Sequence, residues 1–174
     1  SPNADEISGM LGRLRAASTR ADLVGGDGMS ETMAKSMLDR EIGIASPSEL
    51  APAGYRFTCQ VNENSDGFAN SSDVPEMNHN ELVGWAGGKS EYAVVIVRSD
   101  YEHSRSKVRM DISKEIIQKH TPTVLEFYPK GDSLIEQSFY HILWGDWTSV
   151  YLAELYQVDD VEVKVIDYLK AELA

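Results

Sequence analysis

The feature that most constrains the fold is a pair of apolar segments with a helical pattern between them. Residues 92–97 read Tyr-Ala-Val-Val-Ile-Val, and residues 123–128 form a second, mostly apolar run. Such runs are typical of strands that are buried on both faces of a sheet. Residues 105–119 repeat apolar side chains at helical spacing. Strand, helix and strand in this order predict a right-handed crossover and a parallel sheet.

The same patterns predict further elements around this unit. Helices are expected over residues 30–40, 50–61, 133–156 and 165–173, with a short strand at 42–45. The side chains expected to face the interior are Met33, Met37, Leu38, Tyr55, Phe57, Cys59, Val108, Met110, Ile112, Ile116, Ile135, Phe139, Ile142, Leu143, Val150 and Tyr151. Gly145 interrupts the longest helix and predicts a closely packed neighbour there.

The first 29 residues are expected to be a connecting helix and a linker. Apolar side chains repeat at helical spacing between Ile7 and Leu14, and the sequence Val-Gly-Gly-Asp-Gly at 24–28 then breaks any helix. Residues 30–174 are expected to form one domain. The fold class we predict is α/β, a three-layer sandwich in which helices flank a parallel sheet.

Composition limits the classes of partner. The chain has 174 residues, 42% of them hydrophobic, which is enough for one globular domain with a real core. A net charge of -12 and the lack of a Lys/Arg cluster argue against nucleic acid and against an anionic membrane surface. No apolar run reaches the roughly 18 residues of a membrane helix, and no signal-peptide pattern opens the chain, so we expect a cytoplasmic protein. Cys59 stands alone, which excludes an internal disulfide and a thiolate metal site.

The residues that suggest chemistry lie in two polar clusters separated by what we interpret as a short polar loop. Residues 60–64 read Gln-Val-Asn-Glu-Asn, and residues 75–85 read Pro-Glu-Met-Asn-His-Asn-Glu-Leu-Val-Gly-Trp. A carboxylate and an imidazole are the usual pair for moving protons. The other histidines, His103, His120 and His141, are far apart in sequence, and no zinc site is expected from them.

Several separated motifs, taken in order, resemble the C-terminal half of bifunctional phosphoglucose/phosphomannose isomerases. They are the two clusters, Tyr-Glu-His at 101–103, Gly-Asp-Trp at 145–147, Tyr-Leu-Ala at 151–153 and Ile-Asp-Tyr-Leu-Lys at 166–170. The resemblance covers the chain from about residue 34 to its end. It implies a sugar isomerase (SIS) domain, a parallel sheet between helices, and a sugar phosphate as substrate.

The resemblance also implies roles for particular residues. Glu63 would be the base that moves a proton between C1 and C2 of an open-chain sugar phosphate through a cis-enediol. His79 would come from a neighbouring subunit and assist ring opening, and Lys170 would steady charge near the ring oxygen. The residues expected to bind substrate are Asn62, Asn64 and Asn78. Neither a metal nor a cofactor is expected, because hydrogen bonds and cationic side chains can stabilise an enediolate.

From the residues alone, other interpretations stay open. Glu63 fits a solvated or capping carboxylate, His79 a packed structural histidine, and Lys170 a solvated charge near a helix end. If the family roles hold, Glu63 and His79 are expected on one face of the domain near an open edge. Because the active site of the family is shared between subunits, we also expect a homodimer.

Two departures from the family bear on function. No hydroxyl-rich turn of the kind that holds the substrate phosphate occurs in the sequence, and residues 64–66 read Asn-Ser-Asp where the family usually has Asn-Ala-Lys. The chain also begins with Ser-Pro and no Met. We therefore expect a part of a longer protein, a phosphate loop supplied by another chain, or lost catalysis. The alternative function is a non-catalytic SIS module that binds a phosphosugar or serves dimerisation.

Overall fold

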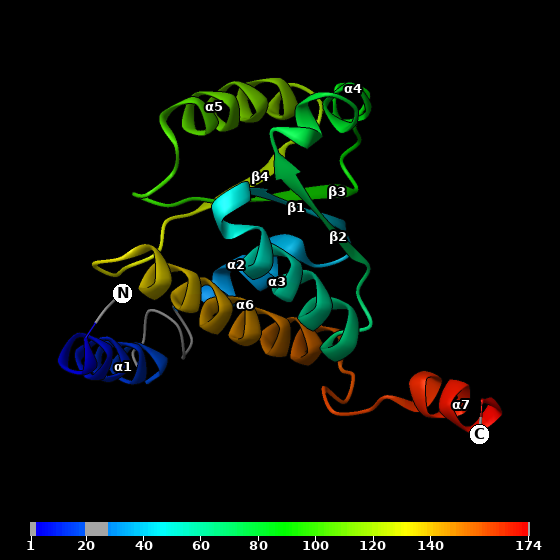
Figure 1. The fold of residues 1–174 in the computed structure, drawn as a ribbon. Coiled ribbons are helices and arrows are strands. Elements are labelled where there is room, and N and C mark those ends of the chain that lie inside the picture. Colours follow the sequence, from blue (N-terminus) through cyan, green and yellow to red (C-terminus); the bar gives the residue numbers. More distant parts are fainter. Residues whose placement is uncertain (1–2, 20–27, 174) are drawn as a thin grey trace.

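A four-stranded parallel sheet forms the centre of the structure, a computed structural model that describes residues 3–19 and 28–173 (Figure 1). The strands lie in the order β2-β1-β3-β4. Their bounds are β1 Glu41–Pro47, β2 Ala69–Val74, β3 Tyr92–Val97 and β4 Thr123–Phe127. All three pairings are parallel, so the sheet predicted from the two apolar runs is confirmed.

Helices cover both faces of this sheet. The α-helices of the described residues are α1 Ala4–Ser18, α2 Met29–Met37, α3 Ala51–Asn64, α4 Glu81–Trp85, α5 Ser104–Gln118, α6 Leu134–Tyr156 and α7 Lys164–Glu172. Figure 1 shows α2, α3 and α6 on one side of the strands and α4 and α5 on the other. This is the predicted three-layer sandwich. The glycine-rich break expected at 24–28 lies, except for Gly28, outside the described residues.

The alternation of side chains along β1 divides the core into two clusters. Ile42 and Ile44 point to the face covered by α3 and α6, whereas Ala45 belongs to the cluster under α5. Central strand β3 is buried on both faces, and Ala93 to Val97 are all buried. This double burial explains why its sequence is so uniformly apolar.

Helices α3 and α6 pack closely through aromatic rings. Phe57 of α3 lies with its ring centroid 5.0 Å from that of Trp144, which stacks on Phe127 of β4 at 4.0 Å. Beside them, a Cβ added to Gly145 would lie 2.9 Å from the Phe57 ring. The prediction that Gly145 meets a close neighbour is therefore confirmed.

Several side chains expected in the interior are at the surface. Tyr55 is 65% exposed, Val108 56%, Ile112 50%, and Ile135 and Phe139 both 47%. The buried face of α6 instead includes polar groups, Gln137 and Thr148 among them. These groups have hydrogen-bond partners, which is what makes their burial tolerable.

The segment interpreted as a polar loop contains a strand. β2, with the sequence Ala-Asn-Ser-Ser-Asp-Val, pairs on one side only, with β1. Edge position explains its polar composition, because its middle side chains stay half-exposed.

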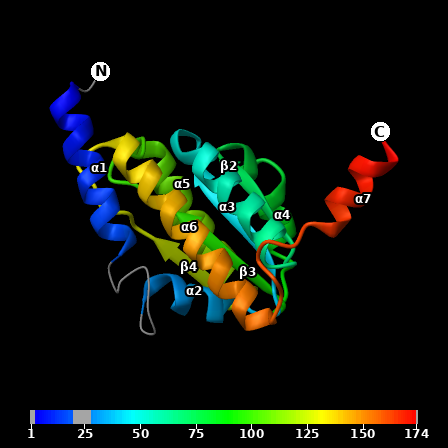
Figure 2. The ribbon, with the colours of Figure 1, turned by 90° about the horizontal axis from the view of Figure 1, so that it is seen from below.

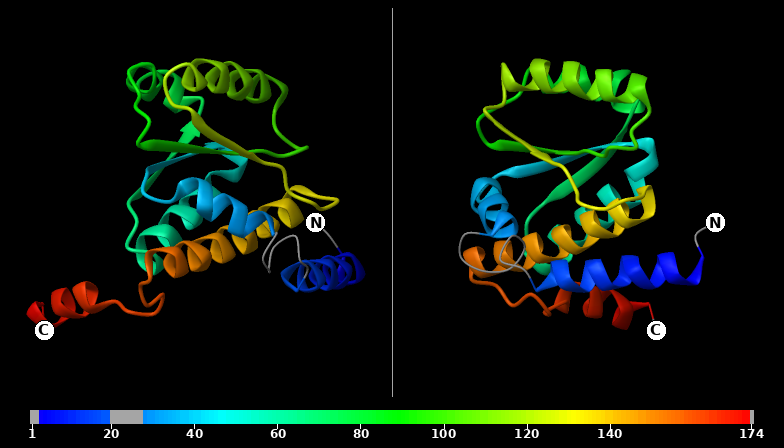
Figure 3. Two further views of the ribbon diagram at one scale, coloured as in Figure 1. Left: turned by 180° about the vertical axis from the view of Figure 1, so that it is seen from behind. Right: turned by 90° about the vertical axis from the view of Figure 1, so that its left-hand side faces the viewer.

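The two terminal helices differ in how they attach. α1 lies along α6, and its Arg13 makes two hydrogen bonds of 2.6 and 2.7 Å to the buried carboxylate of Glu136 (Figure 2). The hydrogen bonds from Arg13 hold the pKa of Glu136 below its ordinary value. α7 has no buried residue, and Figure 3 shows it extending away from the rest of the chain.

His141 is a buried histidine whose surroundings shift its pKa. Its ring is buried, with Nε2 2.7 Å from the carbonyl oxygen of Arg98. Burial lowers the pKa of His141 to about 4, and the hydrogen bond to Arg98 opposes this shift only in part. The imidazole is therefore neutral at physiological pH.

We expect Gly145→Ala to destabilise the protein by about 1–3 kcal/mol, because Phe57 is packed against Trp144 and cannot yield to the new methyl group. Urea unfolding would measure this. Gly12→Ala is the matched control in an exposed helical position with open space around its Cβ, and should gain about 0.5–1 kcal/mol. Equal responses of the two variants would contradict the close contact.

We also expect stability to depend on His141 at acidic pH. The pKa of His141 falls from an ordinary 6.5 to about 4 on folding, so the unfolded chain binds more protons between these values. The contribution is complete above pH 6.5 and is lost as pH falls toward 4, with a slope of up to about 1.4 kcal/mol per pH unit. Urea unfolding at several pH values should show a shallower slope for His141→Gln, whereas exposed His120→Gln should leave the slope unchanged. An NMR titration that places the pKa of His141 near 6.5 would contradict this account.

Candidate functional site

The last turn of α3 carries three of the predicted site residues, and two of them anchor it. Asn62 donates from Nδ2 to the carbonyl oxygen of Ala69 at 3.1 Å and accepts from the Ala69 amide at 2.7 Å. Asn64 donates to Ser149 Oγ on α6 at 2.9 Å. These bonds tie the end of α3 to the start of β2 and to α6. The amides predicted to bind substrate thus position the backbone on both sides of Glu63.

Glu63 itself is exposed and makes no hydrogen bond or ion pair with the part of the chain that the structure describes. An exposed carboxylate on a fixed backbone is available to an incoming ligand or to a second chain. This arrangement is compatible with the base role that the resemblance implies.

The second polar cluster follows β2 in a 3₁₀ turn, Glu76–Asn78, and continues into α4. Met77 is buried and anchors the turn, and Asn78 donates from Nδ2 to Ser113 Oγ of α5 at 2.7 Å. His79 is exposed, and its ring has no partner among residues 3–19 and 28–173. Asn80 caps α4 by accepting from the amide of Glu81. The imidazole is therefore presented to solvent from a fixed turn.

One chain does not bring Glu63 and His79 together. α3 runs back along the sheet, so Glu63 lies where β2 begins, while His79 follows the end of β2. A strand of six residues spans roughly 20 Å. The two residues also flank opposite faces of the sheet, since α3 lies on one side and α4 on the other (Figure 1). The expectation that they share one face is wrong.

Lys170 lies on α7, which leaves the domain from the end of α6. Its side chain is 72% exposed, and its Nζ is 3.9 Å from a carboxylate oxygen of Asp167 on the same helix. Within the described part of the chain, Lys170 therefore belongs to neither polar cluster.

The carboxyl end of the sheet, where ligands of α/β folds commonly bind, holds an ion cluster around a buried arginine. Arg98, 1% exposed, donates to Glu102 at 2.9 Å, to Asp111 at 2.8 Å and to Glu126 at 2.7 Å. Burial opposes its charge, but the hydrogen bonds to these carboxylates outweigh that cost and raise the pKa of Arg98. Its guanidinium also lies over the ring of Tyr128. The cation is thus fully engaged with carboxylates and is not offered to an anion.

Sequence reasoning missed this cluster. The available signal was an arginine directly after an apolar strand, with an acidic residue four positions later. The described residues contain no group of three or more His, Cys, Asp or Glu side chains that could hold a metal ion. None of the described helices combines the length and apolarity needed to cross a bilayer.

Comparison with known sequences identifies relatives of this chain. Residues 27–173 match the family described as the bacterial phospho-glucose isomerase C-terminal SIS domain. A bifunctional phosphoglucose/phosphomannose isomerase of Aquifex aeolicus is 37% identical over 132 residues, covering 75% of this chain and 41% of the relative. One of Caldicellulosiruptor bescii is 37% identical over 135 residues, covering 76% and 39%. The chain thus spans about two fifths of the length of these relatives.

Solved structures agree on the fold. A glucose-6-phosphate isomerase like protein of Thermus thermophilus superposes with a TM-score of 0.65 at 18% identity, over 80% of this chain and 48% of the other. Tagatose-6-phosphate ketose/aldose isomerase of Escherichia coli superposes with a TM-score of 0.61 at 13% identity, over 88% and 45%. The family match over residues 27–173 and the two relatives at 37% identity show that this chain belongs to the family of bacterial phosphoglucose isomerase C-terminal SIS domains.

Proposed function

We propose that this chain supplies the general base of an aldose-ketose isomerase that interconverts glucose 6-phosphate, and mannose 6-phosphate as a second substrate, with fructose 6-phosphate. One observation carries the proposal. Glu63 stands exposed and unpaired among the described residues, between two asparagines whose amides fix the backbone on either side. The backbone that carries this carboxylate is fixed and the carboxylate is not neutralised by a partner, and both favour proton abstraction beside a carbonyl.

In the proposed reaction, Glu63 takes the proton from C2 of the open-chain aldose, the C–H electron pair forms the C1–C2 double bond, and the carbonyl π pair moves to O1, which gains a proton to give the cis-enediol. O2 then loses its proton and becomes the ketone oxygen, while the double-bond electrons take the proton back from Glu63 at C1 and yield the ketose. Lys170 and His79 would act on ring opening and on charge at the sugar oxygens. The reaction moves hydrogen within one molecule and needs no external oxidant, so proton transfer and orientation suffice for this chemistry.

The separation of Glu63 and His79 along β2 supports a site that is assembled from two chains. Each residue faces solvent beside the edge strand, so a second copy could place its His79 next to the first copy's Glu63. A two-fold dimer would then contain two equivalent sites.

The alternative is a module that binds a phosphosugar or only dimerises. The acidic cluster around Arg98 leaves the carboxyl end of this sheet unsuited to a phosphate, which favours the second of these roles, dimerisation, over phosphosugar binding. In our proposal, the substrate phosphate is bound by another domain or chain. The exposed apolar residues Ile135 and Phe139 of α6 provide a surface against which such a domain could pack.

Replacing Glu63 with Gln in the natural polypeptide that contains this chain should lower kcat by about two to four orders of magnitude, with little change in sugar phosphate binding. The amide keeps the shape of the side chain but cannot accept the carbon-bound proton. A coupled assay with glucose 6-phosphate measures the change. Glu154→Gln, an exposed carboxylate on α6, is the control and should keep full activity. Turnover of Glu63→Gln within threefold of the unchanged protein would favour the non-catalytic alternative.

Mixed dimers test the shared site. Glu63→Gln and His79→Ala should each be nearly inactive as homodimers. A heterodimer purified through two different affinity tags would keep one intact site and should regain about half of the normal activity. A heterodimer as inactive as its parents would show that both residues must come from the same chain.

A further inference from the structure

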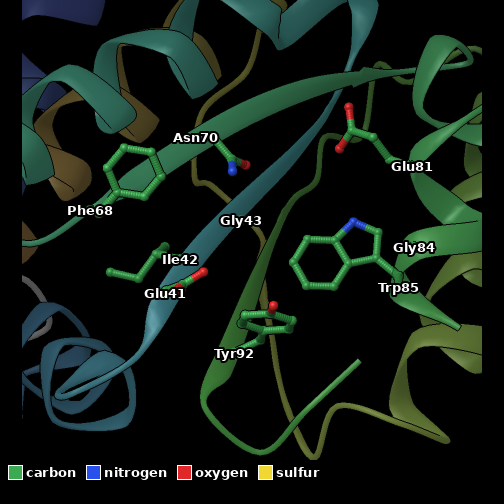
Figure 4. A pocket seen from close by; sticks show the side chains of 9 residues that line it. All are labelled: Glu41, Ile42, Gly43, Phe68, Asn70, Glu81, Gly84, Trp85 and Tyr92. Carbon is green, nitrogen blue, oxygen red and sulfur yellow. The ribbon is translucent and has the colours of Figure 1, made fainter. Parts of the chain in front are cut away.

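A cavity of about 310 Å³ opens beside the amino ends of β1, β2 and β3, on the face that α4 partly covers (Figure 4). None of the proposed catalytic residues lines it, because Glu63 is on α3 across the sheet and His79 lies past the other end of β2. Ligand pockets commonly measure about 300–1,000 Å³, so this cavity suits a small molecule.

Strand register explains why these side chains meet. Glu41 of β1 pairs with Tyr92 of β3, and two residues further on Gly43 pairs with Asn70 of β2. Side chains two residues apart point to the same face, so all three strands contribute to one wall. Trp85 of α4 closes the opposite side, as Figure 4 shows.

Gly43 is what allows the indole to approach the strand. A Cβ at this position would lie 2.6 Å from Cζ2 of Trp85, closer than real contacts allow. The ring of Tyr92 meets that of Trp85 edge-on, with centroids 5.6 Å apart and planes at 83°. Phe68, which is 68% exposed, borders the cavity from the β2 side. Two perpendicular rings and a third nearby form an aromatic corner.

The charges around this corner have one sign. Glu41 and Glu81 line the cavity, and no Lys, Arg or His side chain does so among the described residues. Glu81 is held in place by the hydroxyl of Ser72, at 2.5 and 2.6 Å from its two carboxylate oxygens. Arg40 precedes Glu41 in the chain, but its guanidinium donates to the carbonyl oxygen of Ser90.

We propose that this cavity is a binding site for a small organic cation, of the substituted-ammonium or guanidinium class. Aromatic faces attract such cations through the ring quadrupole, and indole does so most strongly. The two carboxylates add charge attraction and would repel a phosphate. The site is therefore separate in ligand class from the proposed sugar phosphate site, and does not depend on it.

A pair of matched probes tests the proposal. Choline and 3,3-dimethylbutan-1-ol have nearly the same shape, but only choline is charged. The NMR signal of the Trp85 indole N–H, assigned by its loss in Trp85→Phe, reports binding to the 174-residue chain. We expect choline to shift this signal saturably and to bind at least about tenfold more tightly than the neutral alcohol.

Charge-removing variants complete the test. The double variant Glu41→Gln, Glu81→Gln keeps the shape of the cavity and should weaken choline binding by about tenfold or more. The control Glu115→Gln, Glu154→Gln removes the same charge from exposed positions outside the cavity and should bind normally.

Several results would overturn the proposal. They are equal binding of alcohol and choline, equal binding by both double variants, and the absence of saturable shifts with choline, tetramethylammonium and guanidinium alike. Displacement of choline by glucose 6-phosphate would instead make the cavity part of the sugar phosphate site, and would also refute it. The Glu63→Gln variant should bind choline normally, whether or not it loses isomerase activity. Each of the two proposals can therefore be refuted without the other.

Discussion

The close approach of α3 to α6 is the contact on which the rest of this structure depends. One face of the parallel sheet must be covered by helices, and Gly145 lets α6 lie against Phe57 of α3. Because this contact fixes the course of α3, it also fixes its last turn, where Asn64 bonds to Ser149 of α6. The position of Glu63 is therefore set by core packing several residues away. The position of a residue at a helix end thus depends on how the rest of that helix packs in the core.

Sequence reasoning worked where burial leaves a simple signature. β3 is buried on both faces, so its sequence is uniformly apolar and was predicted within its observed bounds. β2 was not predicted, because an edge strand pairs on one side only and tolerates Asn, Ser and Asp. The apolar stripe predicted for α6 is correct for Leu143 and Tyr151, which pack against the core, and wrong for Ile135 and Phe139, which are exposed. In the turn that carries Ile135 and Phe139, the helix instead buries Gln137 through hydrogen bonds to Ser99 and Asp100. Pattern alone does not reveal which polar groups find partners.

The candidate site, too, could be predicted from the sequence only in part. Local composition was enough to single out the two polar clusters, since amides and carboxylates rarely gather so densely in a short segment. Their spatial relation required knowledge of β2, which separates Glu63 from His79 by a strand's length. The cavity beside Trp85 was less predictable still, because its walls come from three strands and a helix that only the register brings into line.

The ion pair between Arg13 and Glu136 affects where the N-terminal boundary of this domain should be placed. Residues 27–173 match the family, so a boundary drawn from the family alone would discard α1. Glu136, which is 3% exposed with α1 in place, would then lose both the guanidinium that balances its charge and the helix that lies beside it. Met10 and Ala17, buried in α1, would also be removed from the surface they cover. The helix expected to be only a connector is therefore bound to α6 by an ion pair and carries two buried side chains, and a cut at residue 27 would remove both kinds of contact.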